Sequence, residues 1–263
     1  MKTLKIKGIV MGEVLYGESS KILKIFTEDL GIISVMSRGC RRIKNAFHEA
    51  SNTLIYANFD ISYKENAIST LTAVDIIKVF KNIQMNYKDL ERKLYAFSLV
   101  KLTNQVLTQK QISPSEIKDI YNTFLSALEK IDDGFDSKTI LDIVMLKYLD
   151  FLGVKPSIDA CSNCGSNTNI VTFSSSSYGY VCDNCYNGEK MVSKDSIKML
   201  RMLYYVDIGR IKTLNISEDV LNEIDDFLND YYEEHTGIYL KKSGIYTMKK
   251  IESIMNLKNK HLL

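Results

Sequence analysis

Two Cys-x-x-Cys pairs place the strongest constraint on what this chain can fold into. The pairs are separated by 17 residues and consist of Cys161 with Cys164 and Cys182 with Cys185. This spacing lies within the range of zinc-binding cysteine motifs. Each pair presents two thiolates from one short turn, and the stretch between the pairs can bring the second pair round to complete a tetrahedron. The sequence therefore predicts one four-thiolate zinc site per chain.

The predicted zinc site is structural. Four protein ligands leave no open position for water or substrate, so we expect the metal to stabilise the fold and to take no part in chemistry. Gly165 suits a tight turn after the first pair, and residues 174–180 are expected to form a hairpin tip. The alternative is two disulfides or a redox pair. The chain opens with a lysine-containing, alternating stretch instead of a long apolar leader, which predicts a reducing, cytoplasmic compartment and favours the metal.

The length of 263 residues predicts about two domains, and a third small segment still fits. Charged residues interrupt every long apolar stretch, so we expect no membrane-spanning segment. Residues 3–79 read as about five short strands, with Leu4, Ile6 and Val10 alternating against polar neighbours. Five strands in so short a segment predict a small Greek-key barrel of the OB type. An SH3-like barrel is the alternative with the same pattern.

The hydrophobic period changes to a helical one after residue 86. Ser113, Pro114 and Glu116 form a capping signature, which predicts a second helix from there to about residue 131. Later helices are predicted to begin at serine caps, namely Ser137, Ser193 and Ser217. The predicted fold is thus a multidomain α+β protein in which a helical domain carries an inserted four-cysteine finger. The segments expected are 1–80 (barrel), 81–158 (helical), 159–190 (finger) and 191–263 (helical).

A basic loop is predicted at the rim of the barrel, where residues 37–44 read S-R-G-C-R-R-I-K. Arg38, Arg41 and Arg42 are half of the six arginines in the chain. The planar guanidinium matches phosphate oxygens and stacks on bases, so these arginines, with Lys44, favour nucleic-acid binding. Aromatic partners for bases are available, although most are expected in the core: Tyr16, Phe26, Phe47, Tyr56 and Tyr63. The alternative is a solvated turn that keeps a sheet edge soluble.

Charge is distributed unevenly although the net charge is only +2. Residues 1–44 contain nine Lys or Arg and four Asp or Glu, whereas residues 213–236 contain eight acidic residues and no Lys or Arg. The C-terminal tail is basic again, at Lys241, Lys242, Lys249 and Lys250. This tail can pair with the acidic helix, or it can extend a nucleic-acid track or receive an acidic peptide.

No enzymatic signature is found in the sequence. Phosphate-binding, dinucleotide-binding, zinc-protease and serine-hydrolase motifs are absent, and the three histidines lie near no recognisable nucleophile or acid pair. Cys40 has only His48 as a neighbouring histidine in sequence, so we do not expect it to be a nucleophile. We therefore expect a protein that is not an enzyme.

Several segments, in their order along the chain, resemble the RecO family of bacterial recombination mediators. The segments are G-I-V at 8–10, Y-G-E-S-S-K-I-L at 16–23, F-T-E-D-L-G at 26–31, S-R-G-C-R-R at 37–42, F-L-G at 151–153, C-S-N-C-G at 161–165 and S-K-D-S-I-K-M-L-R at 193–201. The resemblance covers nearly the whole chain. Its specificity comes from the order of the segments, since no single one of them would suffice.

The resemblance implies a set of functional expectations. It implies binding to single- and double-stranded DNA, strand annealing, action with RecR and with the acidic tail of single-strand binding protein, and help in loading RecA, in the bacterial cytoplasm at the nucleoid and without catalysis. The residues that match the DNA-contacting loop are Arg38, Arg41, Arg42 and Lys44, with Lys21 and Lys24 as weaker candidates. Some relatives lack the finger cysteines, which implies that the finger is not required for the family's activity.

Two other functions remain alternatives from the sequence. The first is a zinc-stabilised protein-interaction module that does not bind DNA, in which the basic loop serves solubility. The second is an RNA-binding OB protein, which differs only in its ligand.

Overall fold

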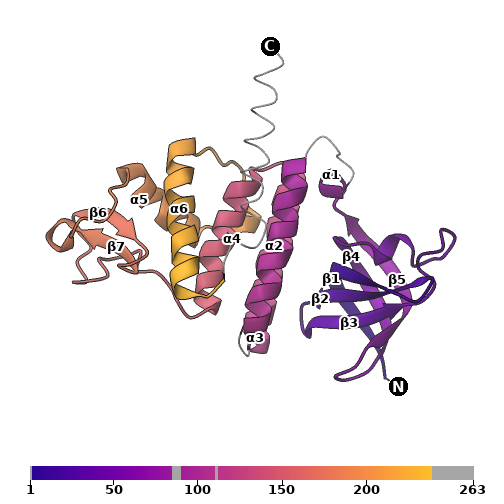
Figure 1. Ribbon diagram of the computed structural model, residues 1–263. Coiled ribbons are helices and arrows are strands. Elements are labelled where there is room, and N and C mark those ends of the chain that lie inside the picture. The colour runs from indigo at the N-terminus through magenta and orange to yellow at the C-terminus, as the bar shows by residue number, and fades with distance from the viewer. Residues whose placement is uncertain (1, 85–89, 110–111, 239–263) are drawn as a thin grey trace, which may run out of the picture. The chain divides into compact units, whose positions relative to one another are not determined.

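The computed structural model describes residues 2–84, 90–109 and 112–238, and Figure 1 shows its elements. The chain divides into two compact units. The barrel unit comprises Met1–Leu90 and Gln111–Asp132, and the helical unit comprises Glu91–Lys110 and Asp133–Leu263. The division into separate domains at residues 80, 158 and 190 stays a prediction. Among the described helices, none is both long and apolar enough to cross a membrane.

A closed five-stranded barrel forms the core of the barrel unit (Figure 1). The strand order around the barrel is β1-β2-β3-β5-β4, and β1 closes it by pairing with both β2 and β4. Only β3 and β5 run parallel among these pairs. This is the predicted Greek-key barrel, and the OB type is confirmed. The strands are β1 (Lys2–Tyr16), β2 (Ser20–Thr27), β3 (Gly31–Ser37), β4 (Ile55–Tyr63) and β5 (Ser69–Val79).

A β-bulge in β1 changes which side chains face the barrel core. Before it, Ile6 and Val10 point into the core, as the alternation predicts. The register then shifts between Val10 and Gly12, so that one residue of β1 has no partner on β2. Beyond the shift, the side chains that would have continued inward point outward, and Val14 and Tyr16 are exposed. The last residues of β1 therefore present apolar side chains to solvent.

Helix α3 (Pro114–Asp133) packs against one end of the barrel. Phe26 of β2 contacts Tyr121 edge-on, with ring centroids 5.3 Å apart, and also contacts Phe124. Such aromatic pairs contribute beyond the area that they bury. The predicted capping signature is confirmed, because the Glu116 carboxylate accepts hydrogen bonds from the backbone N–H and the hydroxyl of Ser113 at 2.8 and 2.7 Å. Helix α3 thus covers the end at which β2 turns into β3, and the basic loop follows the opposite end of β3.

The helical unit is organised around α4 (Ser137–Phe151), most of whose residues are buried. Two buried hydrogen bonds fix it: Tyr148 shares one with Thr103 at 2.9 Å, and the Met145 carbonyl accepts one from Tyr232 at 2.8 Å. A small β-hairpin, β6 with β7, belongs to the same unit. The remaining elements are α1 (Lys81–Gln84) in the barrel unit, α2 (Leu90–Gln109), β6 (Ile170–Ser174), β7 (Gly179–Cys182), α5 (Lys194–Tyr205), α6 (Glu218–His235), and the short 3-10 helices η1 (Glu49–Ser51), η2 (Asp183–Cys185) and η3 (Ile208–Arg210).

The predicted caps are correct for two helices and wrong for one. Ser193 caps α5 by accepting a hydrogen bond from the Ser196 N–H at 3.1 Å, and Ser217 occupies the N-cap position of α6 without a side-chain bond. Helix α4 was expected to begin after Ser137, but its N-cap is Asp136, whose carboxylate accepts from the Thr139 N–H at 2.7 Å. A carboxylate accepts more strongly than a neutral hydroxyl and also favours the positive end of the helix dipole, so the cap lies one residue earlier.

Replacing the observed cap of α4 should destabilise the protein more than replacing the predicted one. We expect Asp136→Ala to lower the free energy of unfolding by about 1 kcal/mol, because an orphan N–H of α4 loses its acceptor. Ser137→Ala should have a smaller effect, since this residue is already helical. Chemical denaturation of both variants measures the difference. A larger loss for Ser137→Ala would show that the cap has been assigned to the wrong residue.

Candidate metal centre and nucleic-acid interface

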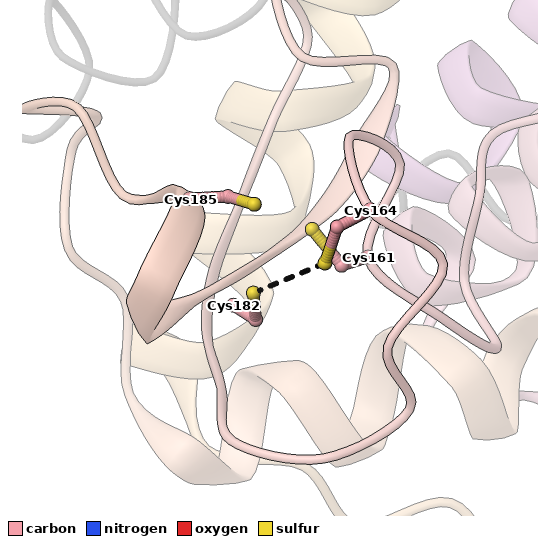
Figure 2. A group of neighbouring side chains, drawn as sticks. All are labelled: Cys161, Cys164, Cys182 and Cys185. Carbon is pink, nitrogen blue, oxygen red and sulfur yellow. Dashed lines mark hydrogen bonds between the residues drawn. The ribbon is translucent and has the colours of Figure 1, made fainter.

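The four predicted ligands come together in the finger of the helical unit. Cys161 and Cys164 lie on the loop before β6, Cys182 ends β7, and Cys185 lies in η2. Their sulfur atoms all lie within 4.8 Å of one another, and the Sγ atoms of Cys164 and Cys182 are 3.6 Å apart. Figure 2 shows the four side chains facing one another. The cluster could therefore hold a metal ion.

The cluster dimensions fit a tetrahedral thiolate site. A zinc–sulfur bond of about 2.3 Å implies sulfur–sulfur edges of about 3.8 Å around the ion. The 3.6 Å edge and the upper limit of 4.8 Å bracket this value, so small side-chain rotations suffice to close the site. Four soft sulfur donors select zinc, iron–sulfur or cuprous species over magnesium or calcium.

The pKa values of the thiols show why the cluster favours a cation. Burial raises the pKa of Cys161, but backbone N–H groups, led by that of Cys182, outweigh burial and lower it to about 6. Hydrogen bonds with the sulfurs of Cys164 and Cys182 raise the pKa of Cys185 to about 12. The thiolate of Cys161 therefore forms easily, and its presence makes deprotonation of the next thiol less favourable. A divalent ion at the centre removes this penalty, because its charge stabilises all four thiolates together.

The finger backbone is shaped by two glycines. Gly165 has a φ of +74° and donates its N–H to the Cys161 carbonyl at 2.9 Å, which confirms the tight turn predicted after the first pair. At Gly179, φ is +130°, and a Cβ built there would lie 2.2 Å from the carbonyl oxygen of Ser157. The backbone at Ser157 therefore approaches the hairpin so closely that only glycine fits.

Two lysines next to the finger in sequence have other partners. Lys190 pairs with Asp226 at 3.1 Å, and the ammonium of Lys155 lies 5.0 Å from the ring centroid of Tyr204. Backbone N–H groups around Cys161 offset the thiolate charge locally.

Contacts outside the cysteine cluster also hold the finger to α5 and α6. The Tyr180 hydroxyl donates to the Ile197 carbonyl of α5, and Phe173 packs edge-on against Phe227 of α6 with centroids 5.1 Å apart. His235, at the end of α6, hydrogen bonds the Ser175 carbonyl through Nε2 at 2.9 Å. The ring of His235 therefore contacts the hairpin tip.

The basic loop at the end of β3 is accessible. Arg38, Arg41, Arg42 and Lys44 are all exposed. Within the described part of the chain, no carboxylate pairs with Arg38, Arg42 or Lys44, so their charges are available to a ligand. The structure therefore brings together the side chains that the sequence singled out. Their role in DNA binding stays a prediction.

Backbone contacts hold the loop while most of its cations remain free. The Cys40 side chain is 1% exposed, and its carbonyl contacts Nδ1 of His48 at 2.8 Å, so the histidine lies against the backbone of Cys40 rather than its sulfur. The Arg41 N–H donates to the Ser19 carbonyl, and its Nη1 donates to the Glu18 carbonyl, both at 2.9 Å. Arg41 thus joins the loop to the β1–β2 turn, a role that the sequence did not reveal.

The two weaker candidates on β2 differ. Lys21 forms an ion pair with Glu13 at 2.7 Å, and its side chain is only 12% exposed. Lys24 is exposed and has no ion-pair partner within the described residues. Lys24 is therefore better placed to contact a ligand than Lys21. The basic tail, with Lys241, Lys242, Lys249 and Lys250, lies outside the described residues.

The aromatic side chains near the barrel are mostly structural, as expected. Phe26 and Tyr56 are buried, and Phe47 and Tyr63 pack against the barrel core. Tyr16 differs, because it is 55% exposed. It is the ring of this group that solvent reaches most.

Fold and site together define an OB-barrel protein with an accessible cationic loop and a separate four-cysteine finger. Two family models match the chain, "Recombination protein O N terminal" over residues 1–80 and "Recombination protein O C terminal" over residues 87–244. The chain therefore belongs to the RecO family.

Curated relatives agree with this assignment. A protein named DNA repair protein RecO from Bacillus velezensis is 29% identical over 223 residues, which cover 84% of each chain. Relatives with the same name from Bacillus pumilus and Listeria monocytogenes serotype 4a are 29% and 28% identical, over 84% and 82% of this chain. The alignments also cover 84% and 82% of those relatives.

Purified, reduced protein should contain about one metal ion per chain, because four thiolates at these distances saturate one tetrahedral ion. Elemental analysis measures the content and identifies the metal. Joint replacement of Cys164 and Cys182 by serine should bring the content close to zero, since hydroxyls replace two thiolates. Cys40→Ser is the matched control and should leave the content unchanged. Metal-free protein with two disulfides would support the redox alternative.

Proposed function

We propose that this chain is a DNA-repair protein that binds single- and double-stranded DNA and anneals complementary strands. The observation that carries the proposal is the set of exposed loop cations Arg38, Arg42 and Lys44, which have no carboxylate partner among the described residues and lie at the rim of an OB barrel. Barrels of this type bind oligonucleotides on the face of strands 2 and 3 and on the β1–β2 and β4–β5 loops. Arg41 joins the basic loop to the β1–β2 turn, which brings the loop to this region. Arg41 and Lys24 add to the positive field, whereas the ion pair with Glu13 makes Lys21 a weaker contributor.

The partners that we propose come from the family. Members of a recombination-mediator family are expected to act with RecR and with the acidic tail of single-strand binding protein, and to help load RecA. No residue of this chain is assigned to those contacts. Membership of the RecO family supports this part of the proposal.

We propose that the finger binds zinc and that the ion is structural. The support is the donor set, four cysteine sulfurs within 4.8 Å of one another. Such a coordination shell is complete without water, so the ion has no position for a substrate. Binding to DNA and annealing require no covalent step, and we propose no catalytic role for any residue.

The loop should control the salt dependence of single-strand binding. Each phosphate contact on a single strand contributes about 0.7 to the slope of log affinity against log salt. We expect the triple variant Arg38→Ala, Arg42→Ala, Lys44→Ala to flatten this slope by about 2. Fluorescence anisotropy with a labelled oligomer, over a range of salt concentrations, measures the slope.

A matched control tests whether the effect is specific to the loop. Lys2, Lys5 and Lys64 are exposed cations of the same unit, near the opposite end of β4. Their joint replacement by alanine removes the same charge and should change the slope by much less. Equal slopes for the wild type and the loop variant would remove the loop from the interface.

The two alternative functions give different results in simple binding assays. A protein-interaction module without DNA binding predicts no retention of single-stranded DNA on a filter at moderate salt. An RNA-binding OB protein predicts that a matched RNA oligomer competes better than the DNA oligomer, because a site built for RNA uses the 2′-hydroxyl. We expect retention of DNA and no preference for RNA.

A further inference from the structure

The outer faces of β1, β2 and β3 carry a short apolar row. Val14 of β1 is opposite Ile22 of β2, and Ile22 is opposite Met36 of β3. Residues directly opposite in antiparallel strands point to the same face, so these three side chains are neighbours. Leu23 and Val35, the adjacent residues on β2 and β3, lie in the barrel core. The row therefore faces away from the core.

Exposure is greatest at the β1 end of this face. Val14 is 58% exposed, and Tyr16, opposite Ser20, is 55% exposed. The Tyr16 ring makes no stacking contact with another ring in the part of the chain that the structure describes. Single exposed apolar residues are common, but a contiguous exposed group beside a charged site indicates a binding surface.

Cations lie on both sides of the apolar row. Lys24 lies two residues beyond Ile22 on β2 and is exposed. On the other side, a hollow of about 610 Å³ is lined by Tyr16, Met36, Arg38, Arg42 and Asn45, among others. The lining of the hollow therefore includes one aromatic residue and two arginines. This combination suits a ligand that has both flat apolar rings and phosphates.

The neighbouring outer face has a different chemistry. The outward residues of β4 are Asn58, Asp60 and Ser62, and Asp75 of β5 is opposite Asn58. Lys7 and Lys5 of β1 are opposite Asn58 and Asp60, so this face carries charges of both signs and no apolar row. The face of β1, β2 and β3 differs because it combines the apolar row with cations that have no carboxylate partner among the described residues.

We propose that the outer face of β1, β2 and β3 is a base-stacking platform for single-stranded DNA, with Tyr16 as its aromatic contact. In this arrangement a base lies against the ring of Tyr16, and phosphates are bound by Arg38, Arg42 and Lys24. The bases of a duplex are already stacked and paired, so only a single strand can use the platform fully. The inference rests on the proposed function and deepens it, because it separates base contacts from phosphate contacts.

The test compares two oligomers of equal length, one with all its bases and one fully abasic. Both carry the same phosphates, so the ratio of their affinities isolates the contribution of the bases. We expect wild-type protein to prefer the oligomer with bases and Tyr16→Ala to reduce its affinity by about 5-fold to 150-fold, the range for the loss of one stacked base. Affinity for the abasic oligomer, affinity for blunt duplex and the salt slope should stay unchanged.

Two matched variants show whether the ring itself is responsible. Tyr16→Phe keeps the aromatic face and should retain wild-type affinity. Leu15 is on the same strand and 62% exposed, but it is opposite Lys21 on the other face of the hairpin. Leu15→Ala should therefore bind both oligomers as the wild type does. Thermal denaturation of each variant checks that the fold is intact.

The outcomes separate this inference from the proposed function. Equal binding of both oligomers by wild-type protein, together with a flattened slope for the loop variant, would overturn the platform and leave DNA binding in place. Wild-type affinity of Tyr16→Ala for the oligomer with bases would also overturn the platform, and the face would then serve another ligand, such as a protein. Failure of wild-type protein to bind single strands at all would overturn the proposed function itself.

Discussion

Closure of the barrel depends on β1, which pairs with β4 along its first half and with β2 along its second half. Residues 2–9 of β1 pair with β4, and residues 8–16 pair with β2, so the strand has to bend where it passes from one partner to the other. The bulge between Val10 and Gly12 provides this bend, because an extra residue increases local twist. Beyond the bulge, the residues of β1 that alternation would place in the core point to solvent instead. Closure of the barrel and exposure of Tyr16 therefore have the same cause.

The bulge in β1 also shows which parts of the structure could be predicted from the sequence and which could not. Strand content, the capping box at Ser113 and the cysteine cluster follow from local patterns, and each of them is found in the structure. The bulge lies beside Gly12, and a glycine inside a strand can mark a bulge, but alternation of apolar residues does not reveal it. Alternation alone therefore places Val14 and Tyr16 on the wrong face. The role of Arg41 was hidden for a related reason, since its partners, the carbonyls of Gly17 and Glu18, lie in another turn of the barrel.

The finger is held by more than its cysteines. A two-stranded hairpin as short as β6 and β7 is marginal by itself, so it needs a metal ion or support from neighbouring elements. Support is present, because Phe173 packs on Phe227 and Tyr180 hydrogen bonds to α5. These contacts hold the finger to α5 and α6 independently of the cysteines. In this chain an ion bound by the cysteines would stabilise the same hairpin as the aromatic contacts.

In the function that we propose, the loop and the platform would provide two different kinds of binding energy. Contacts between cations and phosphates weaken with salt and depend little on whether the strand is single or paired. Stacking of bases on an apolar face is nearly independent of salt and requires unpaired bases. A protein that combines the two can hold duplex and single strands through the loop and still favour single strands through the platform. This combination suits the strand annealing that we propose, because such a platform would release the bases as they pair, while the loop would continue to hold the backbone.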